Sequence, residues 1–224
     1  MKKLTKFGII IAAAITALVV SCASTESSPD DQAIERGISI WNNRDPEAAE
    51  AYWKEIADAT KQKTWLGYVT KYNEGVKALD STDEIKSTQE AKLLAACNKA
   101  LDNFTALDER LELPEDVCEK GATLTAARVD KLLAAEKPAQ AKKMYNSALK
   151  VYGSNDALAD VGKEMDVVNV ILSKQSALNA QVDKALKNEN FDEKISAVDS
   201  AIANYRSAET EINGVAAKNE VDKR

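Results

Sequence analysis

The side chains that carry most protein chemistry are scarce in this sequence. There is no histidine among the 224 residues, which removes the commonest general base and a frequent metal ligand. No glycine-rich phosphate loop, calcium loop or nucleophile elbow occurs. Two pairs of neighbouring acids, Asp108 with Glu109 and Glu115 with Asp116, have the residue type for acid and base work, but such pairs usually form a solvated charged face. We therefore expect a protein that is not an enzyme, with no catalytic residue, metal site or cofactor.

Cys97 and Cys118 have the residue type for a disulfide, which an exported chain favours. With a turn expected near Glu112, Cys118 lies six residues after the turn and Cys97 lies 15 residues before it. The mismatch of about nine helical residues corresponds to roughly 13 Å, beyond the limit of about 7 Å between the Cα atoms of a disulfide. Each cysteine also falls on an apolar helical stripe, where a free thiol acts as a small core residue. We expect the two thiols to be unpaired.

The third cysteine, Cys22, follows a segment with the order of an export signal. Three lysines within the first six residues precede an apolar run over residues 7–20, and the small residues Ser21 and Ala23 flank Cys22. A helix needs about 20 apolar residues to span a bilayer, and this run is shorter. We expect residues 1–21 to be a cleaved signal peptide rather than a permanent membrane span.

The tetrapeptide Val19-Val20-Ser21-Cys22 resembles the lipobox of bacterial lipoproteins, although Val19 stands where leucine is usual. The resemblance implies that Cys22 carries acyl chains of the palmitate type and becomes the new N-terminus. Because each buried methylene contributes about 0.8 kcal/mol, two chains suffice to hold a protein on a membrane. The implied location is the cell envelope, on the periplasmic face of either membrane or at the cell surface. Ordinary cleavage after Ala23 is the alternative and predicts a secreted soluble protein.

Charge limits the partners of the mature chain. Removing residues 1–21 takes away three lysines and no acid, which leaves 27 basic against 36 acidic residues and a net charge of −9. Nucleic acid is a poor partner for this charge, because its binding depends on lysine and arginine neutralising phosphates. Residues 22–28 are small and polar and predict a lipidated tether of about 20 Å at most.

From Ser28 onward the pattern predicts an all-α protein. Ser28-Pro29 and Asp45-Pro46 are helix start signals, and the segment from Ser81 to Glu84 is typical of a capping box. Apolar residues recur at helical spacing throughout. The expected helices span residues 29–43, 46–59, 63–80, 83–111, 114–136, 138–152, 155–188 and 191–217.

The last two expected helices carry a heptad pattern. Its positions in the first of them are Leu158, Val161, Met165, Val168, Leu172, Gln175, Asn179, Val182 and Leu186. The final helix continues the spacing with Ile195, Val198, Ile202, Tyr205 and Ile212. Such a pattern predicts that the aliphatic stripes pack together in a long antiparallel hairpin. We expect a helical domain over residues 29–152 and this hairpin, packed on it, over residues 153–224.

Three segments share a helix start, then a small position, a bulky position and a further small or apolar position. They are Pro46, Ala49, Trp53, Ile56; Pro138, Ala141, Tyr145, Ala148; and Phe191, Lys194, Val198, Ala201. This spacing resembles the second helix of tetratricopeptide (TPR) repeats, and Gly37 stands where the first helix of that pattern takes a small residue. The resemblance implies stacked antiparallel hairpins, as a right-handed solenoid, whereas ordinary packing in an irregular bundle gives the same spacing.

Aromatic residues are concentrated in the first third of the mature chain, including all three tryptophans. Core packing accounts for most of them, and we expect any partner contact to involve Trp41, Tyr68 and Tyr72, because aromatic side chains anchor interfaces. The expected function is a lipid-anchored, non-catalytic scaffold or adaptor that binds another protein. An accessory protein that holds a small or apolar ligand for periplasmic transport is one alternative, and a structural spacer is another.

Membrane attachment should depend on Cys22, because no other segment is expected to hold the mature protein on a bilayer. We predict that Cys22→Ser moves the protein from the membrane fraction to the soluble fraction. Fractionation of cells followed by a high-salt wash measures this. A variant that stays with the washed membranes would remove the basis for the lipoprotein assignment.

Overall fold

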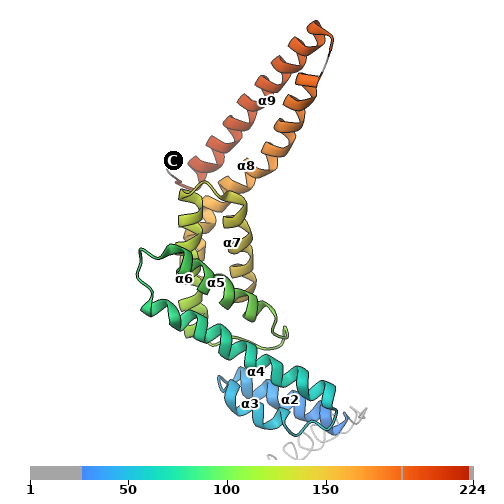
Figure 1. Cartoon of the computed structure of the whole chain (residues 1–224), viewed down its shortest axis with the longest axis vertical. Helices are drawn as coiled ribbons and strands as arrows, with labels where there is room; N and C mark the ends of the chain where they lie inside the picture. Colours follow the sequence, from blue (N-terminus) through green and yellow to red (C-terminus); the bar gives the residue numbers. More distant parts are fainter. Residues whose placement is uncertain (1–26, 188, 222–224) are drawn as a thin grey trace, which may run out of the picture. The chain divides into compact units, whose positions relative to one another are not determined.

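The computed structural model describes residues 27–187 and 189–221, and within these ranges the chain is all-helical (Figure 1). The helices are α2 (Pro29–Asn42), α3 (Pro46–Trp53), α4 (Ala59–Asp80), the 3₁₀ helix η1 (Ser81–Glu84), α5 (Glu90–Thr105), α6 (Glu115–Ala134), α7 (Pro138–Tyr152), α8 (Asp156–Lys187) and α9 (Phe191–Lys218). The predicted all-α class is confirmed. The chain divides into two compact units: unit 1 ends at Leu66, and unit 2 begins at Gly67.

One predicted helix, over residues 83–111, is wrong at both ends. The hydroxyl of Ser81 donates to the carbonyl of Ala78 at 2.7 Å, and that of Thr82 donates to the carbonyl of Leu79 at 2.6 Å. These hydroxyls satisfy the last carbonyls of α4 and do not cap a following helix. The chain therefore passes through η1, and α5 begins only at Glu90.

In unit 1 the core is a stack of three indole rings. The ring centroid of Trp53 lies 5.7 Å from that of Trp41 and 5.1 Å from that of Trp65. The Nε1 of Trp53 donates to the carbonyl of Ile34 at 3.3 Å. A Cβ on Gly37 would overlap the Trp53 indole, so glycine is what lets α2 and α3 approach this closely, as its position in the sequence predicts.

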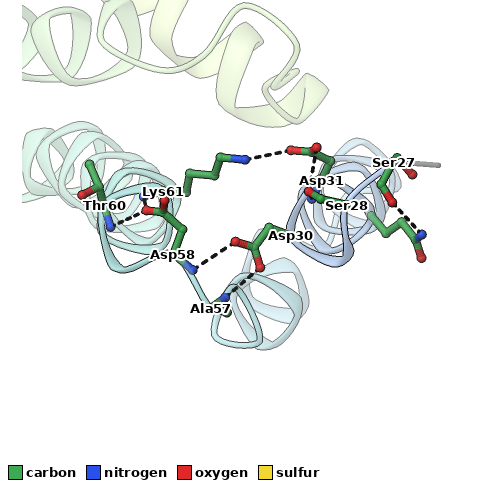
Figure 2. A network of polar contacts seen from close by, with 9 residues as sticks. Ser27, Ser28, Asp30, Asp31, Ala57, Asp58, Thr60 and Lys61 are labelled. Carbon is green, nitrogen blue, oxygen red and sulfur yellow. Dashed lines mark hydrogen bonds and ion pairs between the residues drawn. The ribbon is translucent and has the colours of Figure 1, made fainter. Parts of the chain in front are cut away.

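A polar network in unit 1 joins the first turn of α2 to the first turn of α4 (Figure 2). The Asp30 carboxylate accepts from the backbone N–H groups of Ala57 and Asp58 at 2.8 and 3.0 Å. Asp58 in turn caps α4 by accepting from the N–H groups of Thr60 and Lys61 at 2.8 and 2.9 Å. Because Asp58 is the cap, α3 ends earlier and α4 begins earlier than the sequence pattern predicts.

The core of unit 2 is built from α4 residues beyond Gly67, α5, α6, α7 and the first half of α8. Leu158, Met165 and their neighbours on α8 are buried in the same cluster as Cys97 and Phe104. The domain boundary expected at residue 152 therefore falls inside this core, because α8 supplies one of its walls. Close approach again depends on glycine, since a Cβ on Gly121 would overlap the ring of Tyr152.

From Asp166 onward, α8 packs against α9 as an antiparallel hairpin (Figure 1). Three polar contacts define the antiparallel register, because residue numbers rise along α9 as those of their partners fall along α8. They are Gln181 with Asn204 at 2.9 Å, Lys174 with Glu211 at 2.7 Å, and Asp166 with Asn219 at 3.0 Å. The buried residues of α9 are Ala201, Ala208 and Ala216. Small side chains at this spacing let the two backbones lie close together.

The expectation that the aliphatic heptad of α9 forms the hairpin seam is wrong. Ile195, Val198 and Ile202 are exposed by 47%, 39% and 47%, whereas Ala201 and Ala208 are exposed by 7% and 5%. The alanine positions face α8 because they permit the closer packing, and this turns the larger residues outward. Only the first half of the α8 heptad, up to Val168, is buried as expected.

We predict that Gly121→Ala destabilises the protein by about 1–3 kcal/mol, because the added methyl group overlaps the buried Tyr152 ring. The matched control is Gly214→Ala in α9, where a Cβ has no neighbour within 4 Å and helix propensity favours alanine by up to about 1 kcal/mol. Urea denaturation followed by circular dichroism measures both free energies. Equal effects of the two substitutions would contradict the close packing of α6 against Tyr152.

Candidate functional site: an apolar stripe on the C-terminal hairpin

The feature that stands out on the described surface is a row of large apolar side chains on α9. Phe191, Ile195, Val198, Ile202 and Tyr205 follow one another at steps of four, three, four and three residues, which keeps them on one face of a helix. We call this row the α9 stripe. Phe191 and Tyr205, at its two ends, are exposed by 74% and 64%.

The adjoining face of α8 widens this apolar surface. Val182 and Leu186 are exposed by 44% and 62%, and Ile171 by 37%. Together with the α9 stripe they are the eight exposed large hydrophobic residues of the described ranges, and all eight lie on α8 or α9. Contiguous apolar surface of this kind marks an interaction site, because a monomeric protein rarely leaves it in water.

A groove runs between the two helices within this surface, which we call the hairpin groove. Its volume is about 360 Å³, and it is lined by Leu178, Val182, Ala185, Leu186, Val198, Ala201, Ile202 and Tyr205. The lining is apolar except for the tyrosine hydroxyl and backbone groups. The alanines supply the floor and the larger residues supply the walls, so the same small residues that hold the hairpin together also shape the groove.

The first two turns of α9 extend past the end of α8. Gln181 is paired with Asn204, so the last residue of α8, Lys187, lies level with Val198 on the same register. Phe191 and Ile195 therefore have no α8 residue beside them, and their exposure follows from this overhang. The hairpin groove flanks only the second half of the α9 stripe.

The residues expected from the sequence to contact a partner lie elsewhere. Trp41 is exposed by 1%, so the expectation that it contacts a partner is wrong: its ring packs on Trp53 inside unit 1. Tyr68 and Tyr72 are half-buried on consecutive turns of α4 in unit 2. The Tyr72 ring lies 6.3 Å from that of Phe104 and packs on the core. Cys22 lies outside the described residues.

The two described cysteines are free, as expected from the helix register. Burial raises the pKa of the Cys97 thiol to about 11. Burial also raises the pKa of the half-buried Cys118 thiol, and the carboxylates of Asp116 and Glu115 raise it further. Both shifts disfavour the thiolate, which is the nucleophilic and metal-binding form. Neither cysteine has the surroundings of a reactive thiol.

Among the four acids named as acid–base candidates, Asp108 forms an ion pair with a neighbouring arginine. Asp108 accepts two bonds from Arg110, at 2.8 Å from Nε and 3.2 Å from NH2. This pairing lowers the pKa of the Asp108 carboxyl, which keeps it ionised. Within the described ranges no group of three or more acidic or cysteine side chains is placed to hold a metal ion.

Unit 2 has a second hollow, of about 470 Å³, beside the end of α5. Its apolar wall includes Phe104, Leu111, Cys118 and Tyr152, while Asp108, Glu109, Glu112 and Lys150 bring charge to its lining. It is the feature that would suit a small ligand. Its mixed charge distinguishes it from the uniformly apolar hairpin groove.

The sequence contained the signal for the α9 stripe, but the signal has two interpretations. The 4-3-4-3 spacing of Phe191 to Tyr205 predicts a packing seam, and the first partner available is α8. The seven-residue interval between Ala201 and Ala208, adjacent to the stripe, is the evidence for a second seam. A helix with an alanine seam and an aliphatic seam side by side can pack each seam against a different partner.

Comparison of this chain with protein-family models, with curated protein sequences and with solved structures gives no match. In the described ranges, no helix is both long and apolar enough for a membrane crossing.

We predict that Cys97 resists alkylation in the folded protein. A pKa near 11 instead of the ordinary 9 lowers the thiolate fraction at pH 8 about a hundredfold, and burial blocks the reagent as well. In a Cys22→Ser background, iodoacetamide labelling followed by mass spectrometry should show Cys118 modified first. In urea the labelling rates of the two cysteines should become similar.

We also predict that the protein folds without a disulfide, so thermal melting curves with and without reductant should coincide. Loss of a native disulfide would instead cost about 2–5 kcal/mol of stability.

Proposed function

We propose that this protein is a lipid-anchored, non-catalytic interaction scaffold of the bacterial cell envelope, and that the α9 stripe is where it binds a helical protein partner. The single observation that supports this most strongly is the clustering of the eight exposed large hydrophobic residues on α8 and α9. A helix face with 4-3-4-3 spacing accommodates another helix by knobs-into-holes packing.

The anchor is part of the same proposal. The export signal and the lipobox resemblance at Cys22 support attachment to a membrane through lipid, with the helical units held near its surface by the tether of residues 22–28. The net charge of −9 calculated for the mature chain argues against nucleic acid as the partner. The α9 stripe, being apolar, favours a protein partner that offers an amphipathic helix.

We also propose that the helix pairs before the hairpin are related to TPR repeats. The packing of α2 with α3 and of α6 with α7 supports this. In the first two motif segments the small positions Ala49, Ala141 and Ala148 are completely buried. The third segment departs from the pattern, because its bulky position Val198 faces outward, and this argues that the final hairpin is a separate element.

The role of accessory binding protein for a small ligand is a weaker candidate. The hollow beside α5 supports it, since a volume of about 470 Å³ falls in the range of small-molecule sites. Its charged lining argues for a polar ligand rather than an apolar one. The spacer role does not account for an apolar stripe that water contacts along its whole length.

We predict that a photoreactive amino acid placed at Ile202 of the full-length chain crosslinks to protein in living cells, while the same group at Ser200 does not. Ser200 is the matched control, because it is exposed on the same turns of α9 and lies off the stripe. Adding Ile195→Glu should reduce the Ile202 adduct at least tenfold. Since Ile195 is half-exposed, the stability of that variant should change by less than about 0.5 kcal/mol.

Adducts are separated by mass and identified by mass spectrometry. Labelling of lipid alone, or equal labelling from Ser200 and Ile202, would contradict the proposed function. A protein adduct that survives Ile195→Glu would show that the α9 stripe is not the contact surface.

A further inference from the structure

The order of residue types along the α9 stripe is symmetrical, and Phe191 and Tyr205 are each seven residues from Val198. The stripe begins with an aromatic residue, continues with three β-branched residues and ends with an aromatic residue, centred on Val198. If two copies of α9 run antiparallel with Val198 at the centre, Phe191 of each faces Tyr205 of the other. A two-fold interface needs such a patch, one that is complementary to itself.

The hairpin groove and the α9 overhang occupy opposite halves of the stripe. The groove flanks Ile202 and Tyr205, while Phe191 and Ile195 extend past the last residue of α8. Because α8 ends level with Val198, the centre of the stripe is also the boundary between these halves. Each chain therefore presents one apolar projection and one apolar groove on the same face.

An antiparallel second copy brings the two features together. With Val198 at the two-fold axis, the overhang of one chain lies alongside the second half of the other chain's stripe. Its Phe191 and Ile195 side chains then meet the groove walls formed by Val182 and Leu186 of the other chain. The reciprocal contact forms at the same time, so both overhangs and both grooves are covered.

Charges on the flank of the stripe fit the same arrangement. Asp192 and Arg206 are 14 residues apart on α9, which places them on one side of the helix but about 21 Å from each other. With the axis at Val198, the antiparallel pairing brings Asp192 of each chain to within two residues, about 3 Å along the helix, of the level of Arg206 of the other, which is within reach of the long arginine side chain. Asp199 lies one residue from the axis and near its own counterpart, so two opposite-charge contacts accompany one like-charge contact.

The second copy covers most of the exposed apolar residues of the hairpin. In the proposed register these are the α9 stripe together with Val182 and Leu186, each exposed by between 39% and 74%. A standard interface buries about 800 Å² on each partner, so the flanking side chains contribute to the contact as well. Neighbouring apolar surface of this extent on a single helical hairpin favours a matching hairpin as its cover.

We propose that two copies of this chain associate through the α9 stripe and the hairpin groove, so that their α9 helices pack antiparallel with Val198 on the two-fold axis and the α8 of each copy flanks the overhang of the other. This inference rests on the proposed function and deepens it, because it identifies the helical partner as a second copy. The dimer presents two lipid anchors and two copies of unit 1.

The first test is disulfide crosslinking of the full-length chain in the envelope of living cells. Val198→Cys should give a reducible band of twice the chain mass, because its two thiols meet at the axis. Ser200→Cys, the matched control off the stripe, should not. Ile195→Cys and Ile202→Cys should crosslink with each other when two tagged copies are expressed together. Equal dimer yields from Val198→Cys and Ser200→Cys, or no mixed crosslink, would overturn the proposed register.

The second test uses charge reversal, with the Val198→Cys dimer yield as the readout. Asp192→Arg and Arg206→Asp should each lower the yield at least threefold, because each creates like-charge contacts across the interface. The double variant should restore it. Restoration cannot come from within one chain, where the two positions are about 21 Å apart. A dimer yield from the double variant as low as that from the single variants would overturn the pairing of Asp192 with Arg206 of the other chain.

The two proposals fail differently. If the photoreactive group at Ile202 labels a different protein while Val198→Cys gives no dimer, the second copy is the wrong partner and the scaffold proposal stands. If the group labels only lipid or nothing, and no dimer forms, both proposals fail.

Discussion

Close approach between helices, made possible by small side chains, is the constraint on which the rest of this structure depends. Gly37 admits the Trp53 indole, and Gly121 admits the Tyr152 ring. On α9 the alanines do the same for α8. An aromatic ring packed against a glycine gains dispersion contacts over the whole face of the ring, because no Cβ holds the backbone of the neighbouring helix away from it. At these three interfaces the helices lie close together, and the neighbouring large side chains pack where the small ones leave room.

The alanine seam of the hairpin illustrates how this constraint reaches function. Had larger side chains faced α8, the two backbones would have been held further apart and the isoleucines of α9 would have been core residues. With Ala201 and Ala208 in the seam instead, the hairpin is stable and yet keeps a second apolar face. The two described thiols differ from this apolar face, because burial raises their pKa and keeps them protonated.

Much of the helical architecture could be predicted from the sequence because its signals are local. Pro46 and Pro138 mark helix starts, and the structure begins α3 and α7 at those residues. The failure at residues 83–111 has a physical reason: a serine or threonine hydroxyl bonds equally well to a preceding carbonyl or a following N–H group, and the sequence alone does not decide which.

The candidate site was harder to predict for a related reason. Periodicity identifies a face of a helix but does not identify what covers it, so the heptad of α9 was assigned to the nearest helix. Burial of Trp41 was missed because an aromatic residue near the N-terminus serves core and interface equally well. In the structure Trp53 packs against Gly37, and all three tryptophans are buried.

The tryptophan stack also divides the molecule spectroscopically. All three tryptophans, Trp41, Trp53 and Trp65, belong to unit 1, and their rings lie within 6 Å of a neighbour. Fluorescence excited at the long-wavelength edge of the tryptophan absorption band therefore reports on unit 1 alone. Circular dichroism in the far ultraviolet is weighted toward the longer helices of unit 2. A single sample therefore carries a fluorescence signal from unit 1 and a circular-dichroism signal that is dominated by unit 2.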